Sequence, residues 1–226
     1  MDIRFLGHAT FELSDGDTSI LIDPFLSPNN PVAPLSADDV NPTHVLLTHA
    51  HVDHLADAVT VAKRTGAACV ALIETANWLS GQGIENVSDP NLGGTVEFDW
   101  GWVKLVQALH SSTTPDGTVT YASGLVINIG GQTVYHLGDT CLFGDMRLIV
   151  ERTPVDIAIV PIGGHYTMDR HDAVVAAQMV DARTVIPCHY NTFPPIETDA
   201  EAFKSDVESQ TGASVVILQP GETHTA

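Results

Sequence analysis

One short segment, His49-Ala50-His51-Val52-Asp53-His54, constrains the chain more than any other feature. It places three imidazoles and one carboxylate within six residues, directly after the apolar run Val45-Leu46-Leu47. Imidazole nitrogens and carboxylate oxygens are the groups that zinc and similar divalent metals take as protein ligands. A random chain of this composition would contain such a match only about 0.002 times, although short motifs carry a known risk of false positives. The segment therefore predicts a metal-binding loop.

The spacing inside this loop suggests how the ligands divide. His49 and His51 are two residues apart, so in extended backbone their side chains share a face. Asp53 and His54 enter the first turn of the following helix, from which they can face a second ion. One loop can thus serve two metals.

Six residues cannot complete two coordination spheres, so further ligands are expected elsewhere. His110, Asp139 and His189 each follow an apolar run, residues 103–109, 133–137 and 185–187. Residues at the exits of strands are where α/β proteins tend to place their chemistry. A lone histidine after a strand is more often structural, but three such residues after a metal loop favour ligands.

Hydrophobic periodicity and turn residues predict strands that dominate both ends of the chain, with helices inserted singly. The second half loosely repeats the order of the first. We expect one α/β domain over residues 1–226, with two sheets sandwiched between helices. The expected strands are 3–6, 9–13, 19–23, 45–47, 67–72, a meander over 87–109, a hairpin of 121–129 and 133–137, 157–160, 185–186 and 214–218; the expected helices are 55–64, 74–79, 144–151, 170–180 with Asp169 as its cap, and 199–210.

Composition narrows the function classes. Nine Lys plus Arg against 28 Asp plus Glu give a net charge of −19, which disfavours binding to a phosphate backbone. There is no apolar run long enough to span a membrane and no signal-peptide pattern at the start. Three cysteines without framework spacing fit a reduced compartment. We expect a cytoplasmic protein with a small-molecule substrate, and homo-oligomerisation stays open.

These motifs resemble the metallo-β-lactamase superfamily, whose signature H-x-H-x-D-H is followed by a distant His, an Asp and a final His. The resemblance covers the whole chain. Five further segments resemble a branch of uncharacterised metal-dependent hydrolases, similar to ascorbate-6-phosphate lactonases and more distantly to the phospholipase D that acts on N-acylethanolamine phospholipids. These segments are residues 5–10, 21–24, 138–140, 161–168 and 189–194.

The resemblance implies a four-layer αβ/βα sandwich of two mixed β-sheets flanked by helices, with two divalent ions at one edge. Zinc is expected, with Mn²⁺, Fe²⁺ or Ni²⁺ as alternatives. The lactamases proper offer a cysteine where this chain has Asp139, which argues against a β-lactam substrate. A related di-iron group has Glu in place of His51, which argues against redox chemistry. The implied ligands are His49, His51 and His110 for the first ion, and Asp53, His54 and His189 for the second, with Asp139 bridging both.

The expected reaction is attack by a hydroxide shared between two ions on an ester, lactone, amide or phosphoester. Asp53 would orient the nucleophile or shuttle its proton. His165 is a candidate general acid or substrate contact, and a structural role is equally open. Two alternatives remain: a phosphodiesterase or nuclease of the same superfamily, and a metal-binding regulatory protein without turnover.

Several neighbouring residues have two readings. Asp23 either orients a ligand histidine or forms an Asp-Pro turn. His8 is either a histidine at the edge of the site or a capping residue. We expect His136 to pack or to support a ligand, and Cys141 and Cys188 to be small buried residues. Asn191, Thr192 and Phe193 are candidates for the pocket wall.

The ligand assignment makes a mutational prediction. Asp139→Ala should abolish activity and release metal, because both ions lose their shared ligand, whereas the matched variant His171→Ala should change little. Metal content and activity of the two purified variants check this. Full activity in Asp139→Ala would refute the two-metal interpretation.

Overall fold

The computed structural model describes residues 1–226 and arranges the chain around two seven-stranded sheets. The first sheet has the order β14-β1-β2-β3-β4-β5-β6 and the second the order β13-β12-β11-β10-β9-β8-β7. The strands of the first sheet are β1 (Asp2–Phe5), β2 (Phe11–Asp15), β3 (Thr18–Ile22), β4 (His44–Leu46), β5 (Ala68–Val70), β6 (Val87–Ser88) and β14 (Thr223–Thr225). Those of the second are β7 (Thr95–Phe98), β8 (Gly101–Thr113), β9 (Val119–Ile129), β10 (Gln132–His136), β11 (Ile157–Pro161), β12 (Thr184–Cys188) and β13 (Ser214–Val215).

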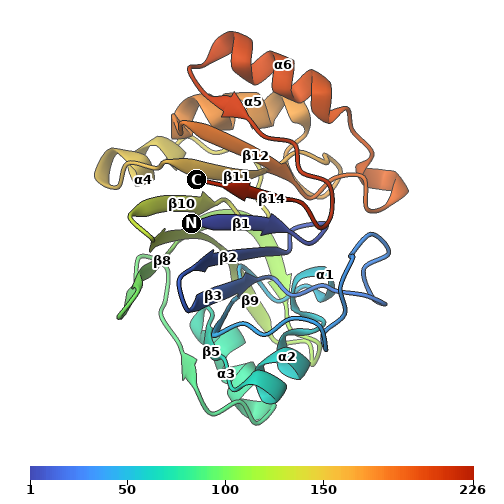
Figure 1. Cartoon of the computed structure of the whole chain (residues 1–226), viewed down its shortest axis with the longest axis vertical. Coiled ribbons are helices and arrows are strands. Elements are labelled where there is room, and N and C mark those ends of the chain that lie inside the picture. Colours follow the sequence, from blue (N-terminus) through green and yellow to red (C-terminus); the bar gives the residue numbers. More distant parts are fainter.

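Both sheets follow the same orientation pattern. In each, four neighbouring strands pair antiparallel, β14 to β3 in one and β7 to β10 in the other. From β3 to β6 in the first sheet, and from β10 to β13 in the second, neighbouring strands pair parallel. The loose repetition predicted from the sequence is thus a repetition of strand order. The predicted last strand, 214–218, stops at Val215, and an unpredicted strand, β14, brings the end of the chain beside β1 (Figure 1).

Three separate hydrophobic cores stack these elements into four layers. A central core joins the inner faces of the two sheets, with Phe11 and Leu46 from the first and Leu125 and Ile159 from the second. A second core packs α2 and α3 on the first sheet, and a third packs α4, α5 and α6 on the other (Figure 1). The predicted four-layer sandwich is confirmed. The helices are α1 (Val52–Leu55), α2 (Ala58–Thr65), α3 (Ile73–Gly81), α4 (Met146–Arg152), α5 (Arg170–Val180) and α6 (Ala200–Gln210), with a 3-10 turn at Pro194–Ile196.

Two further predicted elements differ from the structure. The expected helix 55–64 is split into α1 and α2, because Asp57 at the break is tied to the preceding loop. Its Oδ2 accepts a hydrogen bond from the Leu26 amide at 2.7 Å, and its Oδ1 accepts one from Asn29 at 3.1 Å. The expected meander over 87–109 is also wrong, since β6 pairs parallel to β5 in the first sheet while β7 and β8 belong to the second.

Aspartates cap the two longest helices, α5 and α6. Asp169 accepts hydrogen bonds from the amides of His171 and Asp172, which confirms it as the predicted cap of α5. Asp199 caps α6 in the same way, through the amide of Ala202. None of the helices combines the length and the apolar character needed to cross a bilayer.

The outer core gives a stability prediction. Phe203 on α6 is fully buried against the second sheet, so Phe203→Ala should lower the free energy of unfolding by about 3–5 kcal/mol. Leu148→Ala on α4, where the side chain is half exposed, should change it by less than about 0.5 kcal/mol. Urea unfolding of both variants checks this, and equal midpoints would show that α6 contributes little to the core.

Candidate metal centre

Of the seven side chains expected to bind metal, four imidazoles surround the carboxylate of another, Asp139. Its Oδ2 lies 3.9 Å from His49 Nε2 and 3.5 Å from His110 Nε2. The same oxygen lies 3.1 Å from His189 Nε2, and Oδ1 lies 3.4 Å from His54 Nε2. Asp139 is 2% exposed. Residues far apart in the chain therefore meet at one buried carboxylate.

Two groups of donor atoms lie near Asp139, and a third group, Asp23, His49 and His54, shares one histidine with each of them. In one, His49, His51 and His110 bring their ligand nitrogens within 4.8 Å of one another. In the other, Asp53, His54 and His189 do the same together with His8. The first two groups are the two sets that the family resemblance implied, the second enlarged by His8.

Unpaired polar atoms test whether a metal fits these residues. His54 Nε2, His189 Nε2 and Asp139 Oδ1 are buried and have no hydrogen-bond partner. A buried polar atom without a partner is costly, and such atoms are rare in native structures. All three lie within the cluster of donors, and metal coordination would satisfy them together. The donor set of imidazoles and carboxylates therefore fits divalent zinc-like cations.

Local structure explains how these donors reach one another. Asp53 and His54 lie in α1, the single helical turn that begins directly after His51, as the spacing predicted. We expected His110 to follow a strand, but it lies inside β8. It stands where the pairing of β8 with β9 becomes irregular, between Gln107 and Ser111. Such a bulge redirects a side chain out of the regular alternation.

A glycine turn places the central carboxylate. Gly138, just before Asp139, has φ +67°, and a Cβ there would lie 2.5 Å from the Ser123 carbonyl oxygen. Only glycine meets both constraints. His8, Asp23 and His189 also have positive φ without being glycine. Strained backbone of this kind clusters at functional sites.

Asp23 orients one of the ligand histidines. Its Oδ2 accepts a hydrogen bond from His54 Nδ1 at 2.8 Å, which leaves Nε2 of that ring facing Asp139. The amide and hydroxyl of Thr48 also donate to Asp23, at 2.8 and 2.5 Å. Two interpretations were open for Asp23, and the structure supports the one in which it orients a ligand histidine.

His8 is a component of the site whose contacts the sequence did not reveal. Its Nε2 lies 3.1 Å from Asp53 Oδ2, and its Nδ1 lies 2.9 Å from Thr192 Oγ1. The His8 carbonyl accepts the His189 amide at 2.7 Å, and the two rings are 4.0 Å apart. His8 therefore links two donor segments. The sequence predicted only that His8 was either a histidine at the edge of the site or a capping residue, within the segment 5–10 shared with the resembling branch.

The electrostatics of the centre follow from burial and from the carboxylates. Burial lowers the pKa of His8 to about 4 and holds the pKa of His49 well below its usual value. Burial opposes charge on His54 too, but Asp139 and Asp23 outweigh it and raise the pKa of His54 well above the usual value. Burial likewise opposes charge on Asp139, yet His189 and His54 hold its pKa well below the usual range. The buried carboxylates thus favour a positive charge between them.

The remaining candidates lie around or outside this cluster. His165 is exposed, and its ring packs on Tyr166 at 4.5 Å rather than on the donors. His136 is buried, where it accepts the Gly138 amide on Nδ1 at 3.1 Å and so supports the turn before Asp139. Cys188 is buried as expected, but the expectation for Cys141 is wrong, because it is exposed after the chain leaves the sheet.

An open cavity of about 490 Å³ lies over the donors. Its polar lining is His51, Asp53, His110 and Asp139 together with Ser111. Of the three predicted wall residues, Phe193 lines the cavity, Thr192 contacts His8, and Asn191 is exposed. A substrate entering this cavity would meet donors of both groups.

The role of Asp23 can be tested with an isosteric change. Asp23→Asn replaces the oxygen that accepts from His54 with an amide group, so metal affinity should fall by about 10–100-fold while the fold persists. Competition with a chromophoric chelator measures the affinity, and circular dichroism checks the fold. His171→Ala, an exposed histidine outside the cluster, is the matched control. Unchanged affinity in Asp23→Asn would show that the hydrogen bond does not tune the ligand.

Comparison with known proteins agrees with this geometry. Residues 2–189 match the family model of the β-lactamase superfamily domain. A solved structure titled as Igni18, a metallo hydrolase from Ignicoccus hospitalis, superposes with a TM-score of 0.89 at 37% identity, covering 99% of this chain and 97% of the other.

Curated relatives match over their full length. A UPF0173 metal-dependent hydrolase of Symbiobacterium thermophilum is 43% identical, covering 100% of both chains. One of Thermus thermophilus is 45% identical over 98% of this chain and 97% of the relative. With its fold, its converging donors and these matches, the chain belongs to the UPF0173 metal-dependent hydrolases of the metallo-β-lactamase superfamily.

Proposed function

We propose that the chain is a dinuclear hydrolase that cleaves a small-molecule ester, lactone, amide or phosphoester. The observation that carries this proposal is the position of Asp139, whose carboxylate lies within 4 Å of imidazoles from both donor groups. A single carboxylate placed in this way is suited to bridging two cations. His49, His51 and His110 would hold one ion, and Asp53, His54 and His189 the other.

Bound zinc ions supply a Lewis acid and lower the pKa of coordinated water towards neutrality, which is the chemistry that hydrolysis requires. The protein keeps the donors ready for this. Asp23 fixes the ring of His54, and the Thr48 hydroxyl lies 3.0 Å from His49 Nδ1, so that Nε2 of each ring faces the centre. Zinc is the ion that we propose, with Mn²⁺, Fe²⁺ or Ni²⁺ as alternatives, since all four accept imidazole and carboxylate.

Asp53 is the residue we assign to positioning or deprotonating the attacking water. Its side chain is 27% exposed and lines the cavity. Burial opposes its charge, but the hydrogen bond from His8 and the nearby His54 outweigh burial and lower the pKa of Asp53. An ionised carboxylate at the cavity surface can accept a hydrogen bond from an attacking water and so orient it. Because the lowered pKa makes Asp53 a weak base, the electrostatics support the orienting role over the proton shuttle. His165 stays a candidate general acid, because its neighbour Tyr166 lines the same cavity.

The size of the cavity supports a small-molecule substrate, since ligand pockets of about 300–1,000 Å³ are typical. The charge of −19 supports this against a nucleic acid. Three free cysteines support a cytoplasmic location. We also propose that residues 1–226 form a single domain.

Elemental analysis combined with a hydrolysis screen tests the proposed function. We expect about two equivalents of divalent metal per chain, turnover of at least one lactone or ester, and complete loss of turnover on chelation with recovery when metal is returned. Bis-p-nitrophenyl phosphate, run beside the lactones, separates the phosphodiesterase alternative.

Two outcomes would contradict the proposal. Metal binding without turnover of any ester, lactone, amide or phosphoester would favour a regulatory metal-binding protein. Full turnover with one equivalent of metal would contradict the two-ion centre but not the hydrolase function.

A further inference from the structure

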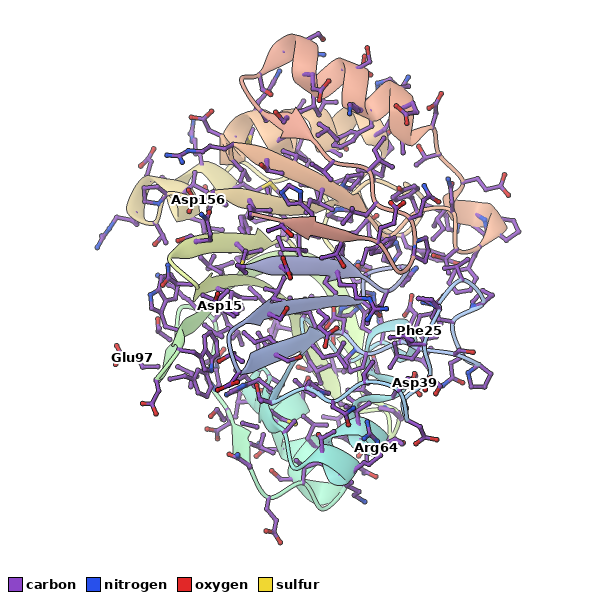
Figure 2. All side chains as sticks on the ribbon, viewed as in Figure 1. Asp15, Phe25, Asp39, Arg64, Glu97 and Asp156 are labelled. Carbon is purple, nitrogen blue, oxygen red and sulfur yellow. The ribbon has the colours of Figure 1, made fainter.

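Part of the lining of the cavity over the metal donors is an apolar wall. Phe25, Val52, Tyr166 and Phe193 line it, and they come from four different segments of the chain. Figure 2 shows Phe25 beside α1, the helix that carries Val52. This wall, defined by these four residues, stands next to Asp53 and His110 in the same cavity. A bound molecule could therefore touch the wall and the metal donors together.

Two of the four side chains are unusually exposed for apolar residues that adjoin a site. Val52 is 70% exposed although it lies between the donors His51 and Asp53, and Tyr166 is 53% exposed. Phe25 and Phe193 form a firmer base, with ring centroids 6.4 Å apart and each 5.6 Å from the buried ring of His8. Exposed apolar groups gathered at a cavity mark a surface that binds something apolar.

Positive charge is absent from the cavity lining. Five of the nine cationic side chains lie within 4.0 Å of carboxylates that do not line this cavity: Arg4, Arg64, Arg170, Arg183 and Lys204. The other four, Lys63, Lys104, Arg147 and Arg152, line pockets that do not include the metal donors. An anionic group placed away from the metal would thus have no cationic side chain to pair with, in a chain of net charge −19.

We propose that the substrate carries an uncharged apolar group, an alkyl chain or aryl ring, that lies against Phe25, Phe193 and Tyr166 while its reacting bond faces the metal donors. This inference rests on the proposed function, because it takes the molecule bound in the cavity to be a substrate. The selection against charge comes from the apolar wall and the missing cations. Neutral lactones and esters fit this site, whereas substrates with a phosphate or carboxylate on the group away from the reacting bond do not.

Binding of hydroxamic acids tests the wall separately from catalysis, because the hydroxamate head chelates zinc. Isothermal titration of the zinc-loaded protein should show octanohydroxamic acid binding at least about tenfold more tightly than acetohydroxamic acid, since each buried methylene adds several-fold. Suberic monohydroxamic acid, which ends its chain in a carboxylate, should lose that advantage. Equal affinity for the two unbranched acids, no binding of octanohydroxamic acid, or tighter binding of the carboxylate would overturn the proposal.

Variants locate the effect. Phe193→Ala and Tyr166→Ala should each reduce the advantage of octanohydroxamic acid by about fivefold while leaving acetohydroxamic acid within about twofold. Tyr166 is exposed, so its variant keeps the test sound if Phe193→Ala is unstable. Leu148→Ala, a half-exposed apolar residue lining a different pocket, should change neither affinity. An unchanged advantage in both wall variants would show that the chain binds elsewhere and would overturn the assignment.

Lactone turnover and hydroxamate binding, measured together, separate this proposal from the proposed function. If neutral alkyl lactones are hydrolysed more slowly than lactones with a terminal carboxylate, the apolar assignment fails and the hydrolase stands. If octanohydroxamic acid binds as expected but no ester or lactone is cleaved, the hydrolase fails and the apolar wall stands.

Discussion

The structure depends on the environment of one buried carboxylate. Asp139 is almost inaccessible to solvent, and one of its oxygens has no hydrogen-bond partner. A carboxylate in that position is unfavourable unless positive charge surrounds it. Four imidazoles face it within 4 Å, from segments that follow β4, lie within β8 and follow β12. Metal ions shared between these groups would supply the missing charge, so the fold and the metal centre are coupled.

This arrangement requires both sheets. The loop after β4 belongs to the first sheet, whereas His110, Asp139 and His189 come from the second. The central core holds the two sheets face to face, so that their strand exits meet at one edge. The repeated strand pattern adds a correspondence: Asp23 follows β3 and Asp139 follows β10, the last antiparallel strand of each sheet. These two carboxylates face the two ring nitrogens of His54, at 2.8 and 3.4 Å.

Much of the fold and the local metal motif could be predicted from the sequence, because both depend on short-range patterns. The segment from His49 to His54 needs only the end of a strand and the first turn of a helix to present its side chains. Strand β14 was not predictable in the same way, since three polar residues acquire a strand only from the neighbouring β1. His110 was predicted as a ligand candidate for the wrong local reason, because a bulge inside β8 rather than the end of a strand places it.

The contacts of His8 show where local reasoning ends. Its partners Asp53 and Thr192 are 45 and 184 residues away, and its positive φ has no signal in a non-glycine residue. The apolar wall has the same character, because its four side chains come from four separate segments. Sequence patterns identify the residue types that bind metal, whereas the packing of the sheets decides which other residues surround them.

Anomalous X-ray diffraction from crystals of the zinc-loaded protein, at energies on both sides of the zinc absorption edge, tests whether Asp139 lies between two bound ions. We expect two peaks about 3.5–4 Å apart, one among His49, His51 and His110 and one among Asp53, His54 and His189, with the Asp139 carboxylate between them. A single peak on one side of Asp139, or zinc bound away from this carboxylate, would contradict this arrangement.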